Sequence, residues 1–234
     1  MNIIITGASN GIGSDIARIL ALNPENRIVG IARSDAKLKM LSDEINQNGD
    51  AENFFALPFD LGLSDIAERL VPKILTFMPT IDILINNAGL LINKPFEQMT
   101  DVDFDDLFKV NVKAPFRLIS SLLPFFNRNA HVVNVSSMGG LQGSTKFAGL
   151  SLYSASKGAL AVLSECMAQE FFDRSISVNA LALGAVQTEM LKQAFPGYTA
   201  PLKSAEMAKF IADFALTGHK YFNGKILPVS VSTP

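Results

Sequence analysis

The sequence contains few of the residues that build disulfides and metal sites. Among its 234 residues there are one Cys, two His and no Trp. A single cysteine, Cys166, excludes an intrachain disulfide framework and a zinc site made of cysteines. The histidines, His131 and His219, lie far apart in the sequence, so a histidine-rich metal site is not expected. We therefore expect no metal, and we interpret Cys166 as a packing residue rather than a nucleophile.

Charge is scarce as well. Only 18% of the residues are charged, and 20 Lys and Arg against 22 Asp and Glu give a net charge of −2. A dedicated nucleic-acid binder usually shows a basic face, so this balance argues against that class.

Although 48% of the residues are hydrophobic, no run approaches the roughly 18 apolar residues of a membrane-spanning helix. Without a basic segment and a long apolar stretch at the start, no signal peptide is expected, and we expect a cytoplasmic protein.

Short apolar runs alternate with segments of helical periodicity along the chain. Strands are expected at 3–5, 27–32, 53–59, 81–86, 131–136, 176–183 and 225–229. Helices are expected after residue 12 and at 36–47, 64–77, 104–126, 154–172 and 204–216, with Pro115 and Pro124 bending or shortening the 104–126 helix. This alternation predicts an α/β fold with a doubly wound, mostly parallel sheet of about seven strands and helices on both faces.

The length fits one domain over residues 1–234. Two irregular stretches, at about 138–151 and 187–203, directly follow predicted strands. Ligands of open α/β sheets bind outside the carboxyl ends of the strands. We therefore expect these two stretches to be substrate loops.

A glycine turn joins the first predicted strand to the first predicted helix, at residues 6–13. Its glycines allow a positive φ and a close approach of the backbone to a ligand. The N–H groups at the start of the following helix suit a pyrophosphate. The alternative is a tight turn without a ligand. The candidate cofactor-binding residues are Gly7, Ser9, Asn10, Gly11, Ile12 and Gly13.

Three motifs, in this order, resemble those of the short-chain dehydrogenase/reductases. They are the turn at 6–13, Asn86-Asn87-Ala88-Gly89, and Tyr153-Ser154-Ala155-Ser156-Lys157, with Asn111 and the 134–137 segment as further matches. The resemblance extends over nearly the whole chain and is to the simple single-domain branch. It implies a Rossmann-like fold, a nicotinamide cofactor, and transfer of a hydride between nicotinamide and a carbonyl or alcohol carbon.

Tyr153 and Lys157 are four residues apart near the start of a predicted helix, so both side chains lie on one face. A tyrosine has an ordinary pKa near 10 and is a poor acid or base at neutral pH unless its phenolate is stabilised. We expect the Lys157 ammonium to lower the pKa of Tyr153, and Lys157 also to bond the cofactor ribose. Such a pair also occurs on ordinary helix surfaces. The resemblance implies instead that Tyr153 gives or takes the substrate proton.

Ser137 is the candidate for the hydroxyl that orients the substrate carbonyl and stabilises the charge developing on its oxygen. Ser136 competes with it but alternates to the other face of the strand, and the resemblance favours the second serine. Asn111 has two interpretations. It can satisfy a backbone break linked to Pro115, or, as the resemblance implies, hold a water in a proton relay to Lys157, and both can apply together.

The end of the second predicted strand indicates which nicotinamide cofactor is used. Position 32 is Ala, where members that prefer NAD usually carry an acidic residue for the ribose 2′-OH. Arg33 suits a 2′-phosphate and Ser34 can add a hydroxyl, which favours NADP (NADPH); a solvated Arg33 is the alternative. Members that prefer NADP often carry a basic residue in the glycine turn. This chain has Asn10 there, so one positive charge that would support NADP binding is missing. Asp35 is expected to cap the next helix.

The resemblance implies further cofactor contacts after the third, fourth and sixth strands, at the adenine and at the nicotinamide amide. Asn86 and Asn87 can equally bridge neighbouring strands. Leu183 stands where many members have Pro, so the following turn is less rigid. These further candidates are Asp60, Leu61, Asn87, Ala88, Gly89, Gly184, Val186 and Thr188.

The leading hypothesis is an NADP(H)-dependent oxidoreductase acting on a small to medium apolar ketone, aldehyde or 3-oxoacyl compound. Apolar residues in the two substrate loops favour such a substrate, or reflect ordinary loop packing. The alternatives are an NAD-dependent alcohol dehydrogenase and a non-catalytic NADP-binding or sensing protein on the same fold. Because the 104–126 and 154–172 helices are apolar around much of their circumference, we expect both sides of each helix to be covered. The resemblance implies that these helices pack across subunits, in a homodimer or homotetramer. Neither a nucleic acid nor a membrane is an expected partner.

Overall fold

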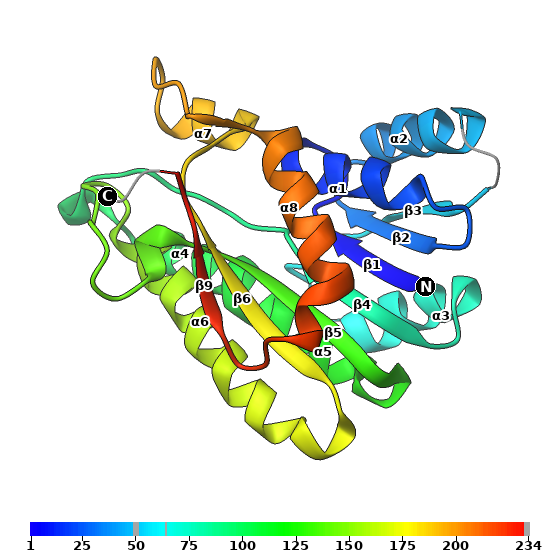
Figure 1. The fold of residues 1–234 in the computed structure, drawn as a ribbon. Coiled ribbons are helices and arrows are strands. Elements are labelled where there is room, and N and C mark those ends of the chain that lie inside the picture. The colour runs from blue at the N-terminus through cyan, green and yellow to red at the C-terminus, as the bar shows by residue number, and fades with distance from the viewer. Residues whose placement is uncertain (49–51, 64, 232–234) are drawn as a thin grey trace.

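The computed structural model describes residues 1–48, 52–63 and 65–231. Its centre is a seven-stranded sheet in the order β3-β2-β1-β4-β5-β6-β9, with every pair parallel (Figure 1). The strand order reverses direction beside β1, which makes the sheet doubly wound. The predicted fold is therefore confirmed. The strands are β1 (Asn2–Thr6), β2 (Arg27–Ala32), β3 (Phe54–Pro58), β4 (Ile81–Asn86), β5 (Phe126–Ser137), β6 (Ser177–Leu183) and β9 (Ile226–Val229).

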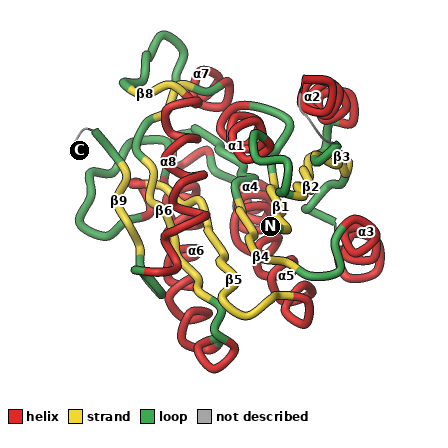
Figure 2. Tube along the Cα trace, turned by 45° about the vertical axis from the view of Figure 1, so that its right-hand side comes forward, coloured by secondary structure: helices red, strands yellow, loops and turns green. Residues whose placement is uncertain are grey.

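Alternating side chains of the strands fill two cores, one on each face of the sheet. In β1, Ile3 and Ile5 pack on one face and Ile4 on the other, because successive strand residues point in opposite directions. Figure 2 shows helices on either side of the strands. The first face is covered by α1 (Gly11–Ala21), α2 (Asp35–Asn48) and α8 (Ser204–Thr217), and the second by α3 (Val71–Phe77), α5 (Ala114–Leu122) and α6 (Ser151–Glu170).

The helix expected over 104–126 is wrong in both its bounds and its continuity. It begins earlier, as α4 (Asp101–Phe108), because Thr100 and Asp103 form a reciprocal capping box. A π-helical turn at Lys109–Lys113 follows, then α5 and a short 3₁₀ turn at Leu123–Phe125. Phe126 is already the first residue of β5. The predicted interruption near Pro115 therefore exists as a π-turn.

Two further regions differ from the expectation. The helix expected over 64–77 is a π-turn at Ile66–Leu70 followed by α3, and residue 64 lies outside the described residues. The 187–203 stretch has structure of its own, with α7 (Glu189–Ala194) between β7 (Val186–Gln187) and β8 (Leu202–Lys203), which pair with each other. Within the described part of the chain, no helix is both long and apolar enough to cross a membrane.

Candidate functional site

The predicted site residues gather at the carboxyl ends of the central strands. Because the strands are parallel, the segments that follow β1, β4, β5 and β6 emerge at one edge of the sheet. Figure 1 shows α7 beyond this edge. The structure thus brings together the glycine turn, the 86–89 motif, Ser137 and the segment at 184–188.

The glycine turn has a backbone that only glycine accepts easily. Gly7 has a φ of 68°, and its N–H donates to the Ile31 carbonyl at 2.8 Å. A Cβ on Gly13 would lie 2.2 Å from the Gly7 carbonyl oxygen, so the helix can start this close to the turn only without a side chain. Asn10 caps α1, its side-chain oxygen accepting from the Gly11 N–H at 2.9 Å. The turn therefore leads straight into the amino terminus of α1.

The 86–89 motif braces this turn. The Asn87 amide donates to the Thr6 carbonyl at 3.0 Å, and the Ala88 N–H donates to the Thr6 hydroxyl at 3.0 Å. The Asn86 amide donates across to the Asn134 side chain at 2.8 Å. The structural interpretation of Asn86 and Asn87 therefore holds. Gly89, at the end of the motif, has the Lys157 ammonium 3.3 Å from the point where a Cβ would stand.

Tyr153 and Lys157 lie in the first turns of α6. Lys157 is buried, with only 4% of its surface exposed, and its ammonium donates to the Val135 carbonyl at 2.8 Å. Burial lowers the pKa of Lys157 to about 8 because the charged form is desolvated. Tyr153 is half-buried. Burial raises the pKa of Tyr153, and a hydrogen bond with the Ser137 hydroxyl opposes this rise.

Burial, and not Lys157, is the largest cause acting on the pKa of Tyr153 in the cofactor-free structure. Desolvation disfavours the charged phenolate and raises this pKa. The Lys157 ammonium meanwhile faces the Val135 carbonyl. In the cofactor-free protein the phenol is therefore held protonated.

The two neighbouring serines at the end of β5 have different surroundings. The buried Ser136 hydroxyl donates to the Lys157 carbonyl at 2.8 Å and fastens α6 to the strand. The Ser137 hydroxyl accepts from the Gly139 N–H at 3.2 Å and also contacts Tyr153. Of the two, Ser137 therefore lies on the Tyr153 side, where the sequence placed the candidate.

Asn111 lies in the π-turn and is fully buried. Its side chain accepts from the Leu90 N–H at 2.8 Å and donates to the Leu90 carbonyl at 2.9 Å. It also donates to the Ser156 hydroxyl at 2.9 Å, one residue before Lys157. The Asn111 side chain therefore joins the π-turn to the segment after Gly89 and to α6, a structural role with partners other than the backbone break at Pro115 that the sequence suggested.

At the end of β2, Arg33 is exposed. The Ser34 hydroxyl accepts from the Lys37 N–H at 3.4 Å at the start of α2, whereas Asp35 is the first residue of that helix. The expected capping role of Asp35 is therefore wrong, because the residue before it supplies the capping oxygen.

After β3, Asp60 is exposed, and Leu61 is buried in the second core.

The segment at 184–188 follows β6 and lies between that strand and the glycine turn. The Gly184 N–H donates to the Val229 carbonyl at 2.9 Å. The Thr188 hydroxyl caps α7 by accepting from the Leu191 N–H at 3.2 Å. A Cβ on Gly11 would stand 3.5 Å from the Thr188 methyl. Thr188 therefore lies against the glycine turn, while Val186 is buried in the first core.

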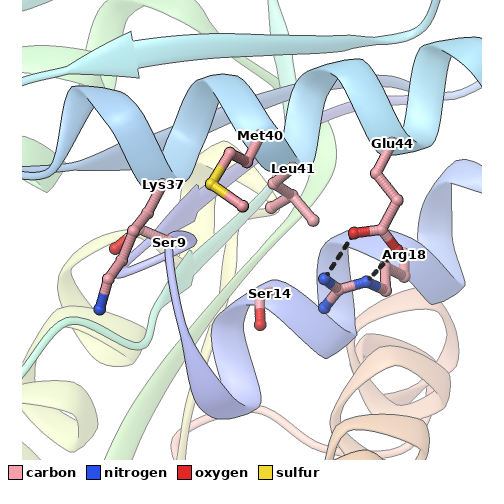
Figure 3. A pocket seen from close by; sticks show the side chains of 7 residues that line it. All are labelled: Ser9, Ser14, Arg18, Lys37, Met40, Leu41 and Glu44. Carbon is pink, nitrogen blue, oxygen red and sulfur yellow. Dashed lines mark hydrogen bonds and ion pairs between the residues drawn. The ribbon is translucent and has the colours of Figure 1, made fainter.

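The structure has two cavities that the sequence predicted only in part, because each is formed by residues that are distant in the sequence. One, of about 190 Å³, lies where α7 meets the segment after Gly89 and is lined by Leu91, Asn93 and Met190 among others. There the Asn93 amide donates to the Ala194 carbonyl at 2.7 Å. The other, of about 150 Å³, lies between α1 and α2 (Figure 3). The α7 side of the first cavity lies in the predicted substrate loop at 187–203, whereas no local signal in the sequence marks the cavity between α1 and α2.

Comparisons with known proteins agree with the fold and the motifs. A family model described as short chain dehydrogenase matches residues 1–199. Nodulation protein G of Rhizobium sp. (strain N33) is 35% identical over 190 residues, which cover 80% of this chain and 74% of that protein. A 3-oxoacyl-[acyl-carrier-protein] reductase FabG of Staphylococcus epidermidis is 28% identical over 239 residues, covering 97% and 96%. The crystal structure of a 3-ketoacyl-(acyl-carrier-protein) reductase from Brucella melitensis, complexed with NADH, has a TM-score of 0.85 at 26% identity, covering 98% and 96%.

Proposed function

Because the chain belongs to the short-chain dehydrogenase family, whose members are oxidoreductases, we propose that it is an NADP(H)-dependent enzyme interconverting a carbonyl and an alcohol. The observation that carries the proposal is the convergence of Ser137, Tyr153 and Lys157 at the sheet edge that also holds the glycine turn. The substrate is a small to medium apolar ketone, aldehyde or 3-oxoacyl compound. The 3-oxoacyl class is supported by the similarity to 3-oxoacyl-carrier-protein reductases.

The residues along the sheet edge fit a nicotinamide dinucleotide. The tight turn at Gly7–Gly13 and the start of α1 offer backbone N–H groups to a pyrophosphate. Near the ends of β4 and β5, Lys157 lies beside Gly89, where a Cβ would stand 3.3 Å from the ammonium, and the space left by the missing side chain would admit a ribose hydroxyl. When bound, the nicotinamide supplies the hydride chemistry.

Tyr153, Ser137 and Lys157 would each have a separate role in proton transfer to the substrate oxygen. The protonated Tyr153 phenol donates to the carbonyl oxygen during reduction and takes the proton back during oxidation. The Ser137 hydroxyl, already in contact with the phenol, orients the same oxygen. The Lys157 ammonium stabilises the phenolate that remains after donation. Burial raises the pKa of the phenol, so the free enzyme holds this proton, and stabilisation of the phenolate by Lys157 has to offset the rise for the proton to transfer.

Asn111 would act through its backbone rather than its side chain. The side chain is engaged with Leu90 and Ser156. Pro115, four residues later, has no N–H, so the Asn111 carbonyl lacks its α-helical donor. A water on this carbonyl can return a proton to Lys157, which combines the two interpretations of Asn111.

Arg33 supports NADP over NAD. It is exposed at the end of β2, and no acidic side chain stands at position 32 to accept from a ribose 2′-OH. A similar solved structure holds NADH, so similarity alone does not decide the cofactor. The preference for NADP thus rests on the charge at Arg33.

We also propose that residues 1–234 act as one cytoplasmic domain, with substrate loops at 138–151 and 187–203, that assembles into a homodimer or homotetramer. Large apolar side chains on α4, α5 and α6 support assembly, since Phe104, Phe116 and Val162 are 44%, 50% and 57% exposed. Light scattering at micromolar protein should give a multiple of 25.3 kDa. A monomer mass would contradict the assembly.

The function is tested by cofactor titration and turnover. NADPH and NADH are titrated by their own fluorescence, and a panel of ketones, aldehydes and 3-oxoacyl thioesters is screened for loss of reduced-nicotinamide absorbance. We expect tighter binding of NADPH, and a fall of about 10²–10⁴-fold in turnover for Tyr153→Phe with cofactor binding retained. Tyr221→Phe, at an exposed tyrosine outside the site, is the matched control. Equal turnover by Tyr153→Phe and wild type would refute the catalytic assignment.

A further inference from the structure

We propose that Lys37, in the first turn of α2, is a second cation for the 2′-phosphate of NADP(H), acting together with Arg33. The inference rests on the cofactor preference proposed above and adds a residue and a cavity to it. Residues 6–13 of the glycine turn contain neither Lys nor Arg, and Lys37 would supply the positive charge that the turn lacks.

The strand register brings the glycine turn beside the end of β2. Thr6 pairs with Ile31, and the N–H groups of Gly7 and Ala8 both donate to the Ile31 carbonyl, at 2.8 and 3.3 Å. Arg33 follows two residues after Ile31. The turn that binds a pyrophosphate and the strand end that meets the ribose are therefore fixed against each other.

Lys37 is tied to the same corner through its backbone. Its N–H donates to the Ser34 hydroxyl at 3.4 Å, so Arg33, Ser34 and the first turn of α2 form one continuous segment. Lys37 and Ser9 of the glycine turn line the same cavity of about 150 Å³ between α1 and α2. Figure 3 shows Lys37 extending from α2 past Ser9, at the end of the cavity away from Arg18 and Glu44.

Of the two cations that line this cavity, Arg18 is paired with carboxylates, whereas Lys37 can bind a further anion. Arg18 also lines it, but its guanidinium makes two contacts with Glu44, at 2.7 and 2.8 Å, and one with Asp15 at 3.2 Å. Lys37 is exposed, and no described acidic group forms an ion pair with it within 4.0 Å. The Ser9 end of the cavity therefore carries uncompensated positive charge.

Asn10 explains why the charge comes from α2 and not from the turn. Its side-chain oxygen accepts from the Gly11 N–H and caps α1. A Lys or Arg at this position could not supply that acceptor, because neither side chain has one. The turn therefore keeps its helix cap, and the second cation is supplied from across the cavity. A phosphate monoester, with about −1.5 to −2 charge at pH 7, is the kind of group that two flanking cations bind.

The test compares two probes that differ only in the 2′-phosphate. Adenosine 2′,5′-bisphosphate and 5′-AMP are titrated calorimetrically into wild type, Lys37→Ala and Arg33→Ala at low and at physiological salt. We expect Lys37→Ala to weaken the bisphosphate by about three- to tenfold and to leave 5′-AMP unchanged. Lys39→Ala is the matched control, because Lys39 is exposed on the same helix and does not line the cavity. Lys37→Arg should restore most of the affinity.

The outcomes separate the inference from the proposed function. If Arg33→Ala weakens the bisphosphate while Lys37→Ala behaves like Lys39→Ala, the NADP preference stands and the role of Lys37 is overturned. If wild type binds both probes equally, the NADP preference itself fails. If Lys37→Ala weakens 5′-AMP as much as the bisphosphate, Lys37 acts on the turn rather than on the 2′-phosphate, and the inference is again overturned.

Discussion

Burial of the Lys157 ammonium should cost the folded protein measurable stability. The side chain is 4% exposed, and burial lowers its pKa from 10.5 to about 8. Such a gap corresponds to about 3 kcal/mol of preference for the neutral form on folding. Its hydrogen bond to the Val135 carbonyl is to a neutral partner and does not remove this cost. We therefore predict that replacing Lys157 with an apolar residue stabilises the fold.

The sign of the pH dependence follows from the direction of the shift. Below about pH 8 both the folded and the unfolded chain hold the Lys157 proton, and the full penalty is present. Between pH 8 and 10.5 the folded chain has lost the proton while the unfolded chain keeps it. Stability of the wild type, measured against a variant without this lysine, should therefore rise over that range.

Lys157→Met is the variant that tests this balance. Methionine has a similar length and no charge, but it leaves the Val135 carbonyl without its donor, which costs about 1–2 kcal/mol. The net expectation at pH 7 is a gain of about 1–2 kcal/mol in the free energy of unfolding, together with loss of turnover. Urea unfolding of cofactor-free protein at several pH values from 7 to 10 measures it.

A control separates this effect from the general effect of exchanging Lys for Met. Lys209 is exposed on α8, so Lys209→Met should change the free energy of unfolding little and without a pH trend. The reasoning is refuted if Lys157→Met is less stable than wild type at pH 7. It is equally refuted if their difference stays constant between pH 8 and 10.

Two further predictions concern buried polar groups. Asn111→Leu removes three hydrogen bonds to Leu90 and Ser156 and should lower the free energy of unfolding by about 3 kcal/mol in a urea titration; an unchanged midpoint would rule out the bracing role. Burial lowers the pKa of His131 to about 4, its ring contacting the Ala215 carbonyl and the Asn179 amide. Because the unfolded chain takes up this proton below pH 6.5 and the folded chain does not, stability should fall by about 3 kcal/mol between pH 6.5 and 4. His131→Gln should flatten that part of the urea-stability profile, and a profile as steep as that of wild type would contradict the assignment.

The parts of the fold that the sequence predicts well are those in which local pattern and tertiary environment agree. The strands at Arg27–Ala32 and Ile81–Asn86 have the predicted bounds, because each is a short apolar run buried on both faces. The break after α4 is different. Pro115 signals that a break exists, but a π-turn at Lys109–Lys113 is set by the pairing of Asn111 with Leu90, which is a tertiary contact. Periodicity cannot reveal such a contact.

In the candidate site, too, the residues predicted by local spacing differ from those that only tertiary contacts bring together. Tyr153 and Lys157 are one helical turn apart, and their spacing alone places them on one face. Lys37 has no motif around it and becomes notable only because the register of β1 and β2 brings Ser9 to the same cavity. The pKa of Tyr153 also depends on burial, which the sequence does not state, so the rise caused by desolvation could not be predicted.

The scarcity of charge in the sequence has a consequence for the site. Within the part of the chain that the structure describes, Lys157 is the one buried side chain with a formal charge at neutral pH. The groups that the structure places beside it are neutral, since its ammonium donates to the Val135 carbonyl and the Asn111 side chain lies next to the same Gly89 position. A buried carboxylate beside Lys157 would stabilise the fold, but it would also cancel the positive potential that a phenolate at Tyr153 needs. With neutral polar neighbours, the buried Lys157 ammonium lowers the stability of the fold, but its positive charge is not cancelled. A tyrosine that acts as acid and base requires this uncancelled charge beside it.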